Sequence, residues 1–85
     1  MSIAKRVNAK STHEAEKLLR ASHYKEYLSY VVEERDLLRA RGATDAHTLN
    51  NAAYHAATKR LRERYEGEYQ RYLHAARDHF YSALA

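Results

Sequence analysis

The chain has 85 residues with no proline, two glycines and no cysteine, and its formal net charge is +4. This length limits it to one domain, and the near absence of helix breakers predicts that almost all of it is helical. The composition excludes disulfides and thiolate metal sites, and no apolar run reaches the ~18–20 residues that span a bilayer. The first ten residues lack the apolar core of a signal peptide, so we expect a cytoplasmic protein.

Size and aromatic composition both predict association. A single core rarely suffices without a covalent staple below roughly 70–80 residues, and this chain lies just above that limit. Eight of its aromatic residues are tyrosines, against one phenylalanine and no tryptophan. Tyrosine suits half-wet surfaces because its ring carries a polar tip. We therefore predict that the chain binds a second copy of itself or another partner.

The N-terminal segment, residues 1–10, is basic and has no usable hydrophobic periodicity, so we predict a flexible arm. Order is expected to begin at Ser11, because Ser11 and Glu14 match the capping box that satisfies free backbone N–H groups at a helix start. The first helix is predicted over about residues 12–41. It ends at Gly42, a residue type that tolerates the left-handed turn after a helix.

The apolar side of this first helix changes direction. Over residues 15–22 it is centred on Leu18 and Leu19, whereas over residues 24–38 it lies on the opposite side at 100° per residue. Either the chain bends near residues 22–23, or a straight helix meets two different molecules, as in an intertwined dimer. We prefer the bend, and the dimer stays as the alternative.

Either the Leu18-Leu19 side or the stripe over residues 24–38 supplies the predicted contact surface for a second copy, and the predicted interface residues lie on the stripe. Around a two-fold axis its apolar side chains would form a seam, and a charge introduced there would be buried unpaired. The predicted interface residues are Leu28, Tyr30, Val31 and Leu38.

A second helix is predicted over residues 45–65. Thr44 or Asp45 can cap its start, and the short connection after Gly42 makes the flanking helices antiparallel neighbours. Small residues on one face, among them Ala53 and Ala57, allow a neighbouring helix to approach closely. We therefore expect this helix to be the central one.

The last helix, predicted over residues 66–84, has the clearest periodic pattern. A helix boundary or kink is expected near residues 65–67, at Gly67, with a continuous rod as the alternative. No internal repeat is visible. The apolar stripe, which begins before Gly67, contains Leu61, Tyr65, Tyr69, Tyr72, Leu73, Ala76, Phe80, Ala83 and Leu84.

A basic run is the main functional signal. Its four cations lie within six residues and could neutralise the phosphates of DNA or RNA, or dock an acidic protein. Because helical spacing puts two of them on one face and two on another, the positive charge wraps around the helix. The run consists of Lys59, Arg60, Arg62 and Arg64.

No pattern of catalytic or metal-binding residues stands out. None of the six histidines lies three or four residues from another, as two ligands on one helix face would. The two glycines are isolated, so no phosphate-binding loop is predicted. We predict no enzyme, no metal site and no cofactor.

The tract KRLRERYEGEYQRYL, residues 59–73, resembles a pattern found in small helical proteins of actinobacteriophages. That pattern runs basic-x-Leu-x-x-x-His-Pro-Glu-Glu-Tyr-x-x-Leu, and Arg60, Glu68 and Tyr69 match it here. Tyr65 replaces the His, while Glu and Gly replace the following Pro and Glu. The resemblance implies a phage origin, and hence the host cytoplasm, but no mechanism.

We predict an all-α fold, with residues 11–85 forming one bundle of three or four helices that homodimerisation completes. The predicted function is that of a non-enzymatic, phage-type accessory protein that binds a macromolecular partner, a host or phage protein above all. The alternative is a nucleic-acid-binding or regulatory protein that uses the basic run. Neither a membrane nor a small-molecule substrate is expected.

Overall fold

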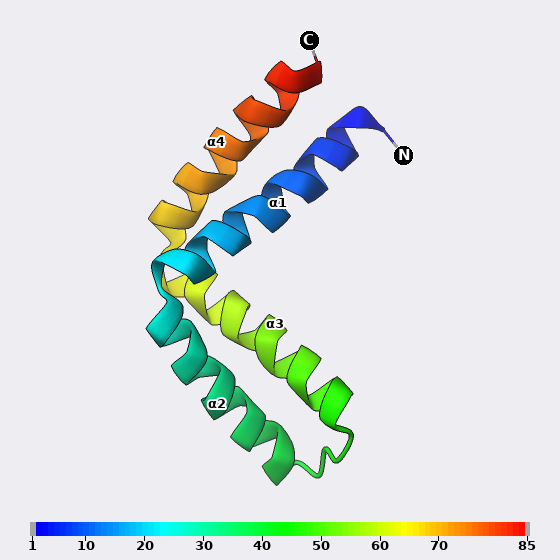
Figure 1. Ribbon diagram of the computed structural model, residues 1–85, viewed down its shortest axis with the longest axis vertical. Coiled ribbons are helices and arrows are strands. Elements are labelled where there is room, and N and C mark those ends of the chain that lie inside the picture. The colour runs from blue at the N-terminus through cyan, green and yellow to red at the C-terminus, as the bar shows by residue number, and fades with distance from the viewer. Residues whose placement is uncertain (1, 85) are drawn as a thin grey trace.

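The computed structural model describes residues 2–84 and forms two arms of a V that meet at an elbow (Figure 1). α1 packs along α4 in one arm, and α2 packs along α3 in the other. α1 and α3 line the inner side of the V, whereas α2 and α4 lie outside. The predicted all-α class is confirmed, with no strand among residues 2–84. The four helices are α1 (Ile3–Ser22), α2 (Tyr24–Ala40), α3 (Ala46–Arg64) and α4 (Glu66–Leu84).

α1 begins eight residues before Ser11, so residues 3–10 are helical and do not form the predicted flexible arm. Ser2 caps the helix, with its Oγ accepting a hydrogen bond of 3.2 Å from the backbone N–H of Lys5. Ser11 is fully buried in the helix interior and does not act as a cap. The reason is that the buried stripe of α1 extends to Val7, which is only 3% exposed.

The chain leaves the helical conformation at His23 and again at Tyr65. Both residues do so in the same way, with φ and ψ of −126° and 46° at His23 and −114° and 44° at Tyr65. Their rings stack at the elbow, with centroids 3.7 Å apart. The sequence predicts a break at both places, a bend near residues 22–23 and a helix boundary or kink near residues 65–67. Because the chain turns at His23, the apolar stripes of α1 and α2 are covered by α4 and α3 of the same chain.

Gly42 makes the turn between α2 and α3. Its φ of +92° lies in the left-handed region that favours glycine. The Gly42 N–H donates to the carbonyl of Arg39 at 3.0 Å, and the Ala43 N–H donates to that of Leu38 at 3.1 Å, which is the Schellman arrangement. Asp45 then caps α3 by accepting from the Thr48 N–H at 3.2 Å.

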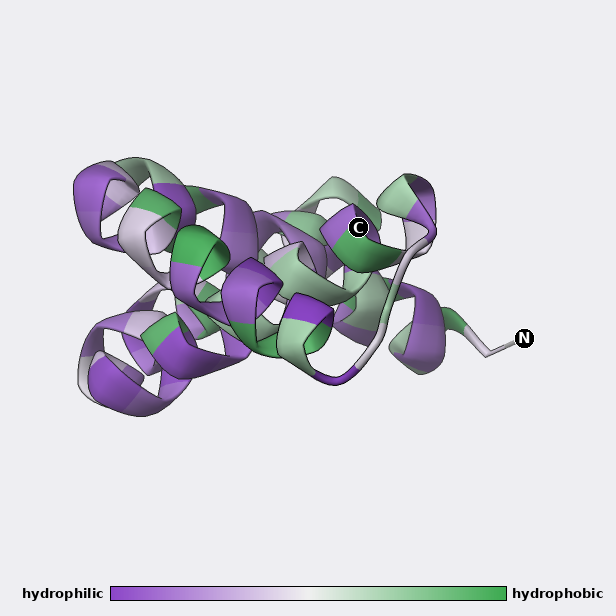
Figure 2. Cartoon of the chain, turned by 90° about the horizontal axis from the view of Figure 1, so that it is seen from below, coloured by the Kyte–Doolittle hydropathy of each residue, from purple (hydrophilic) through white to green (hydrophobic). Residues whose placement is uncertain are grey.

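The core is thin and has two clusters. At the elbow, Leu19 and Leu61 are the largest fully buried hydrophobic side chains, and they pack with Ala15, Tyr69 and Leu73. The second cluster, in the α2–α3 arm, contains Val31, Ala53 and Ala57. Figure 2 shows how hydrophobic residues recur along each helix among more numerous hydrophilic ones. Each arm is therefore two helices held by one narrow apolar seam.

The chain contains an internal repeat, so the expectation of no repeat is wrong. The first half (residues 3–40) corresponds to the second half (residues 45–82), with each position matching the one 42 residues later. Of these 38 pairs, twelve are identical: Ala4/Ala46, Asn8/Asn50, His13/His55, Ala15/Ala57, Lys17/Lys59, Leu19/Leu61, Arg20/Arg62, Glu26/Glu68, Tyr27/Tyr69, Tyr30/Tyr72, Arg35/Arg77 and Asp36/Asp78.

The structure follows the same correspondence. Leu19 and Leu61 are both 0% exposed, and the helix breaks at His23 and Tyr65 are equivalent positions. The repeat maps α1 onto α3 and α4 onto α2. It therefore maps one arm of the V, α1 packed on α4, onto the other arm, α3 packed on α2. The two halves are thus related by an approximate two-fold axis that passes through the stacked rings at the elbow. One chain has the architecture of a dimer.

Candidate nucleic-acid interface on the inner side of the V

The excess positive charge lies on the two inner helices. α1 has five basic and two acidic residues, and α3 has four basic and one acidic. The outer helices have the opposite balance, with three basic and four acidic residues on α2 and two basic and three acidic on α4. Because α1 and α3 line the inner side of the V (Figure 1), the excess of positive charge belongs to the inner pair of helices and the excess of negative charge to the outer pair.

Two equivalent arginines cross the elbow between α1 and α3. Arg62 Nη1 donates to Glu16 Oε1 at 3.3 Å, and Arg20 Nη1 donates to Thr58 Oγ1 at 3.4 Å. Glu16 and Thr58 are themselves equivalent positions of the repeat. The two arginines therefore make reciprocal contacts, each with the other half of the chain.

Each of these arginines also lies over a tyrosine of its own half. The guanidinium carbon of Arg62 is 4.4 Å from the ring centroid of Tyr69, and that of Arg20 is 6.0 Å from the ring centroid of Tyr27. Tyr69 is only 3% exposed, so its ring is a fixed platform under the Arg62 cation. These contacts hold two positive charges in defined positions where the inner helices meet.

Further cations extend from each arginine along the same helix face. Lys17 and His13 lie three and seven residues before Arg20, spacings that share a face of a helix, and Lys59 and His55 bear the same relation to Arg62. The two lysines and two histidines are exposed. We call this set the inner basic face: His13, Lys17, Arg20, His55, Lys59 and Arg62.

The lysines of the inner basic face form no ion pair in the part of the chain that the structure describes. Within residues 2–84, neither Lys17 nor Lys59 takes part in an ion pair or a side-chain hydrogen bond. Arg20 and Arg62 share the carboxylate of Glu16, at 3.8 Å and 3.3 Å. Four cations meet three carboxylates at the inner elbow, because Glu63 and Glu66 lie beside an adjoining groove in addition to Glu16. The elbow therefore keeps a small positive charge that attracts polyanions.

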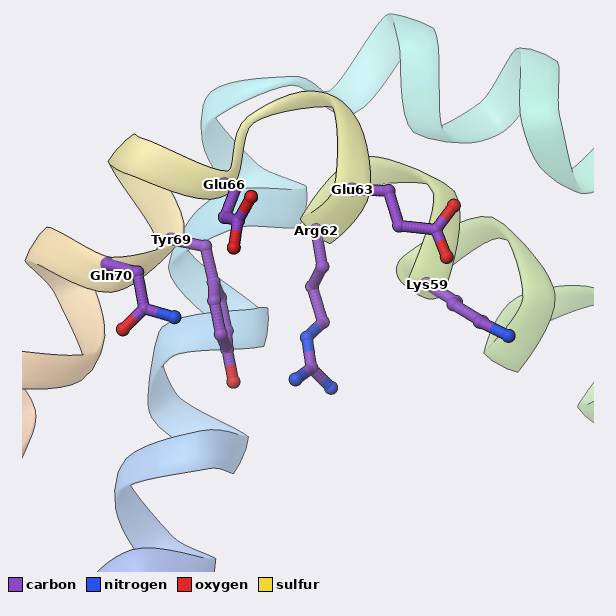
Figure 3. Close-up of a pocket in the computed structure, with 6 residues that line it drawn as sticks. All are labelled: Lys59, Arg62, Glu63, Glu66, Tyr69 and Gln70. Carbon is purple, nitrogen blue, oxygen red and sulfur yellow. The ribbon is translucent and has the colours of Figure 1, made fainter.

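An open groove of about 430 Å³ adjoins Lys59 and Arg62. Figure 3 shows Arg62 and Tyr69 pointing into it from α3 and α4. Glu63 and Glu66 on its rim offset the two cations, so the groove by itself is not an anion site. Its lining residues are Lys59, Arg62, Glu63, Glu66, Tyr69 and Gln70.

The structure divides the predicted basic run between two sides of α3. Lys59 and Arg62 belong to the inner basic face, whereas Arg60 and Arg64 turn to α2. Arg60 Nη1 lies 2.7 Å from a carboxylate oxygen of Glu33 and 3.4 Å from one of Glu34. The hydrogen bond to Glu33 raises the pKa of the Arg60 guanidinium.

Arg64 is held in a similar way. Its Nε lies 3.5 Å from Glu26 Oε1, and its Nη1 donates to the Tyr30 hydroxyl at 3.2 Å. The hydrogen bond to Tyr30 and the charge of Glu26 raise the pKa of Arg64. Because α2 supplies carboxylates to both of these arginines and Glu16 of α1 pairs with Arg62, three of the four cations of the predicted run are used inside the molecule.

The residues of the predicted dimer interface are mostly covered by α3. Val31 is 3% exposed and packs with Ala53 and Ala57, and Tyr30 and Leu38 are half-buried against the same cluster. Leu28 is the exception, with 41% of its surface exposed. The burial of Val31 therefore needs no second copy.

A polar network closes the elbow around Glu68. Its Oε2 lies 2.6 Å from His23 Nε2, and its Oε1 accepts a hydrogen bond of 2.8 Å from the Tyr72 hydroxyl. These two hydrogen bonds lower the pKa of Glu68, and the one to His23 has the larger effect. Ser22 Oγ contacts the Tyr72 hydroxyl at 2.9 Å, so Ser22 is paired with a phenol and not with the histidine base that a nucleophilic serine requires.

The equivalent network in the other half keeps the glutamate and has Tyr65 in place of His23. Glu26 corresponds to Glu68, and its hydrogen bond is the largest cause of the raised pKa of Tyr65, the residue that corresponds to His23. The network is thus a repeated structural element that fixes the two breaks.

Sequence reasoning missed His13, Lys17, Arg20 and His55. A usable signal was present, because the pattern His-x-Ala-x-Lys-x-Leu-Arg occurs at residues 13–20 as HEAEKLLR and again at residues 55–62 as HAATKRLR. The Ala and Leu of this pattern are fully buried in both copies, so packing in the core explains why both halves have the same residue at these positions. The exposed His and Lys have no such explanation, and exposed polar residues held in common indicate binding.

No family model, no curated protein and no solved structure matches this chain. Between residues 2 and 84, no helix is both long and apolar enough to cross a membrane. The same residues contain no group of three acidic or histidine side chains gathered as metal ligands.

Proposed function

We propose that this chain is a non-enzymatic nucleic-acid-binding protein that contacts phosphates with the inner basic face. The observation that carries the proposal is the repeated His-Lys-Arg set on the two inner helices. The lysines of that set are exposed, and neither forms an ion pair with a carboxylate within the described chain. Phosphate contacts of this kind supply most of the affinity of proteins that bind nucleic acid without reading its bases.

Salt dependence tests this proposal directly. Each phosphate that a duplex-bound cation neutralises contributes about 0.9 to the slope of log affinity against log salt. We expect a labelled nucleic acid to bind at about 50 mM salt and to lose affinity steeply towards 200 mM. Lys17→Ala combined with Lys59→Ala should reduce the slope by about 2.

The matched control removes the same charge from the outer helices. Lys25→Ala combined with Arg71→Ala changes two exposed cations, one on α2 and one on α4. We expect the control to keep the affinity and slope of the unmodified chain within a small nonspecific change. Equal losses in both double variants, or no binding at low salt, would contradict the proposal.

A second candidate, binding of a protein partner, is favoured by an exposed apolar stripe. α2 presents three apolar residues at spacings of four, and Tyr54 of α3 stacks near Tyr27 with centroids 6.3 Å apart. The exposed members are Tyr24, Leu28, Val32 and Tyr54, at 59%, 41%, 53% and 42%. The equivalent positions in the other half are Glu66, Gln70, His74 and Thr12.

The second half has polar residues at the equivalent positions, so the fold does not require apolar side chains there. The apolar side chains of the first half therefore support a contact surface for a partner. The predicted homodimer is one form of this candidate and now rests on the same stripe. A phage accessory role suits either candidate: a tract similar to the actinobacteriophage pattern occurs twice, as residues 19–30 and 61–72, and the first copy has His23 where the pattern has His.

A further inference from the structure

We infer that the ligand of the inner basic face is a double-stranded helix, bound with the two-fold axis of the protein on a two-fold axis of the duplex. This inference rests on the proposed function and names its ligand. The inner basic face consists of two equivalent sets of cations, one on α1 and one on α3, which the internal repeat relates. This symmetry is the observation from which the form of the ligand is inferred.

The symmetry of the two sets matches that of a duplex. The strands of a duplex are antiparallel, so two-fold axes perpendicular to the helix axis exchange one strand for the other. A two-fold symmetric protein placed on such an axis makes the same contacts with both strands, as dimeric binding proteins do. Here Lys17 would meet one strand where Lys59 meets the other.

The elbow holds the two sets at a fixed separation. Arg20 and Arg62 bond across it to Thr58 and Glu16, and the rings of His23 and Tyr65 stack 3.7 Å apart behind them. Phosphates on the two strands of a duplex also have a fixed separation, whereas a single strand is flexible. A rigid pair of cationic sets therefore favours the duplex, because less backbone conformational entropy is lost on binding than with a flexible single strand.

The side chains of the inner basic face also differ from those of single-strand binders. Such proteins stack bases on exposed aromatic rings. The set contains no phenylalanine, tyrosine or tryptophan, and the rings beneath its two arginines are covered: Tyr69 is 3% exposed under Arg62, and Tyr27 under Arg20 is half-buried. Lys, Arg and His at these positions meet phosphates, so the duplex would be held by its backbone with little sequence preference.

The experiment compares the two halves one residue at a time. Binding of a short labelled duplex and of one of its strands is measured by fluorescence anisotropy over a salt series. The proteins are the full chain, Lys17→Ala, Lys59→Ala and the double variant, with Lys25→Ala as the outer-side control. Both lysines of the inner face are exposed, and helix content by circular dichroism verifies that each variant folds.

We expect the duplex to bind more tightly than the strand. We also expect Lys17→Ala and Lys59→Ala to lose the same factor in affinity and to lower the salt slope by about 1 each. Equal binding of the strand, or a loss confined to one lysine, would overturn the two-strand inference and leave nucleic-acid binding in place. Failure of both nucleic acids to bind would remove the proposed function as well.

Discussion

At the scale of single residues, Glu68 links the elbow to pH. It is the carboxylate at which His23 and Tyr72 meet, and their hydrogen bonds lower its pKa in the folded state. A group whose pKa is lowered on folding stabilises the protein above its unfolded pKa, and this stability is lost as the pH falls through the folded pKa. Through Glu68, the elbow should therefore loosen in acid.

We predict that Glu68→Gln flattens the acid side of the stability curve. The unmodified chain should lose melting temperature as the pH falls from about 6 to about 3, and the variant should lose less over the same range. Glu63→Gln, an exposed carboxylate on α3, is the matched control. Parallel curves for Glu68→Gln and the unmodified chain would show that the network does not contribute.

Single residues also show where sequence reasoning stops. The four cations of residues 59–64 form one run in the sequence, and helical spacing divides them between two faces. Which face is used internally depends on partners far along the chain, since Glu34 and Tyr30 precede Arg60 and Arg64 by 26 and 34 residues. Spacing alone therefore predicts the division but not which pair α2 holds.

At the scale of elements, the sequence predicts a helix end correctly where capping residues and backbone hydrogen bonds a few residues apart determine it. The turn at Gly42 and the cap at Asp45 lie where the sequence predicts them, because both depend on backbone groups a few residues away. The start of α1 was misplaced, because the burial of Val7 depends on α4 at the other end of the chain. Tertiary burial there outweighed the capping pattern at Ser11.

The elbow core gives a prediction for pairs of elements. Leu19 of α1 and Leu61 of α3 are equivalent, fully buried and in one cluster. Leu19→Ala and Leu61→Ala should each lower the free energy of unfolding by about 2–4 kcal/mol, with similar values for the two. Because the side chains share a cluster, the double variant should cost less than the two losses added.

Urea denaturation followed by circular dichroism measures these values. Leu37→Ala is the control, since Leu37 is 50% exposed on α2 and should cost well under 1 kcal/mol. A large cost at one buried leucine and a small cost at the other would mean that the two halves do not contribute equally to the elbow.

At the scale of the whole molecule, the internal repeat accounts for the features that predicted a dimer. The opposed stripes of residues 15–22 and 24–38 indicate two partners, and the V supplies both, as α4 and α3 of the same chain. The repeat was hidden because its identical residues are scattered, with no more than two adjacent. A fused pair of halves gives the same hydrophobic pattern as a homodimer, so the sequence alone did not distinguish them.

The apolar side chains of α2 that the single chain leaves exposed decide whether two chains associate. Val31→Glu does not test this, because Val31 is buried against α3 and a charge there destabilises a single chain as well. Leu28, at 41% exposure, is the informative position. If two chains pack on the stripe of Tyr24, Leu28 and Val32, the mass by light scattering is twice 9.9 kDa, and Leu28→Glu returns it to 9.9 kDa with the melting temperature of the single chain retained. A mass of 9.9 kDa for the unmodified chain at high concentration would exclude the homodimer. The stripe would then be a surface for a different protein, because the apolar seams inside the two arms are already covered by helices of the same chain.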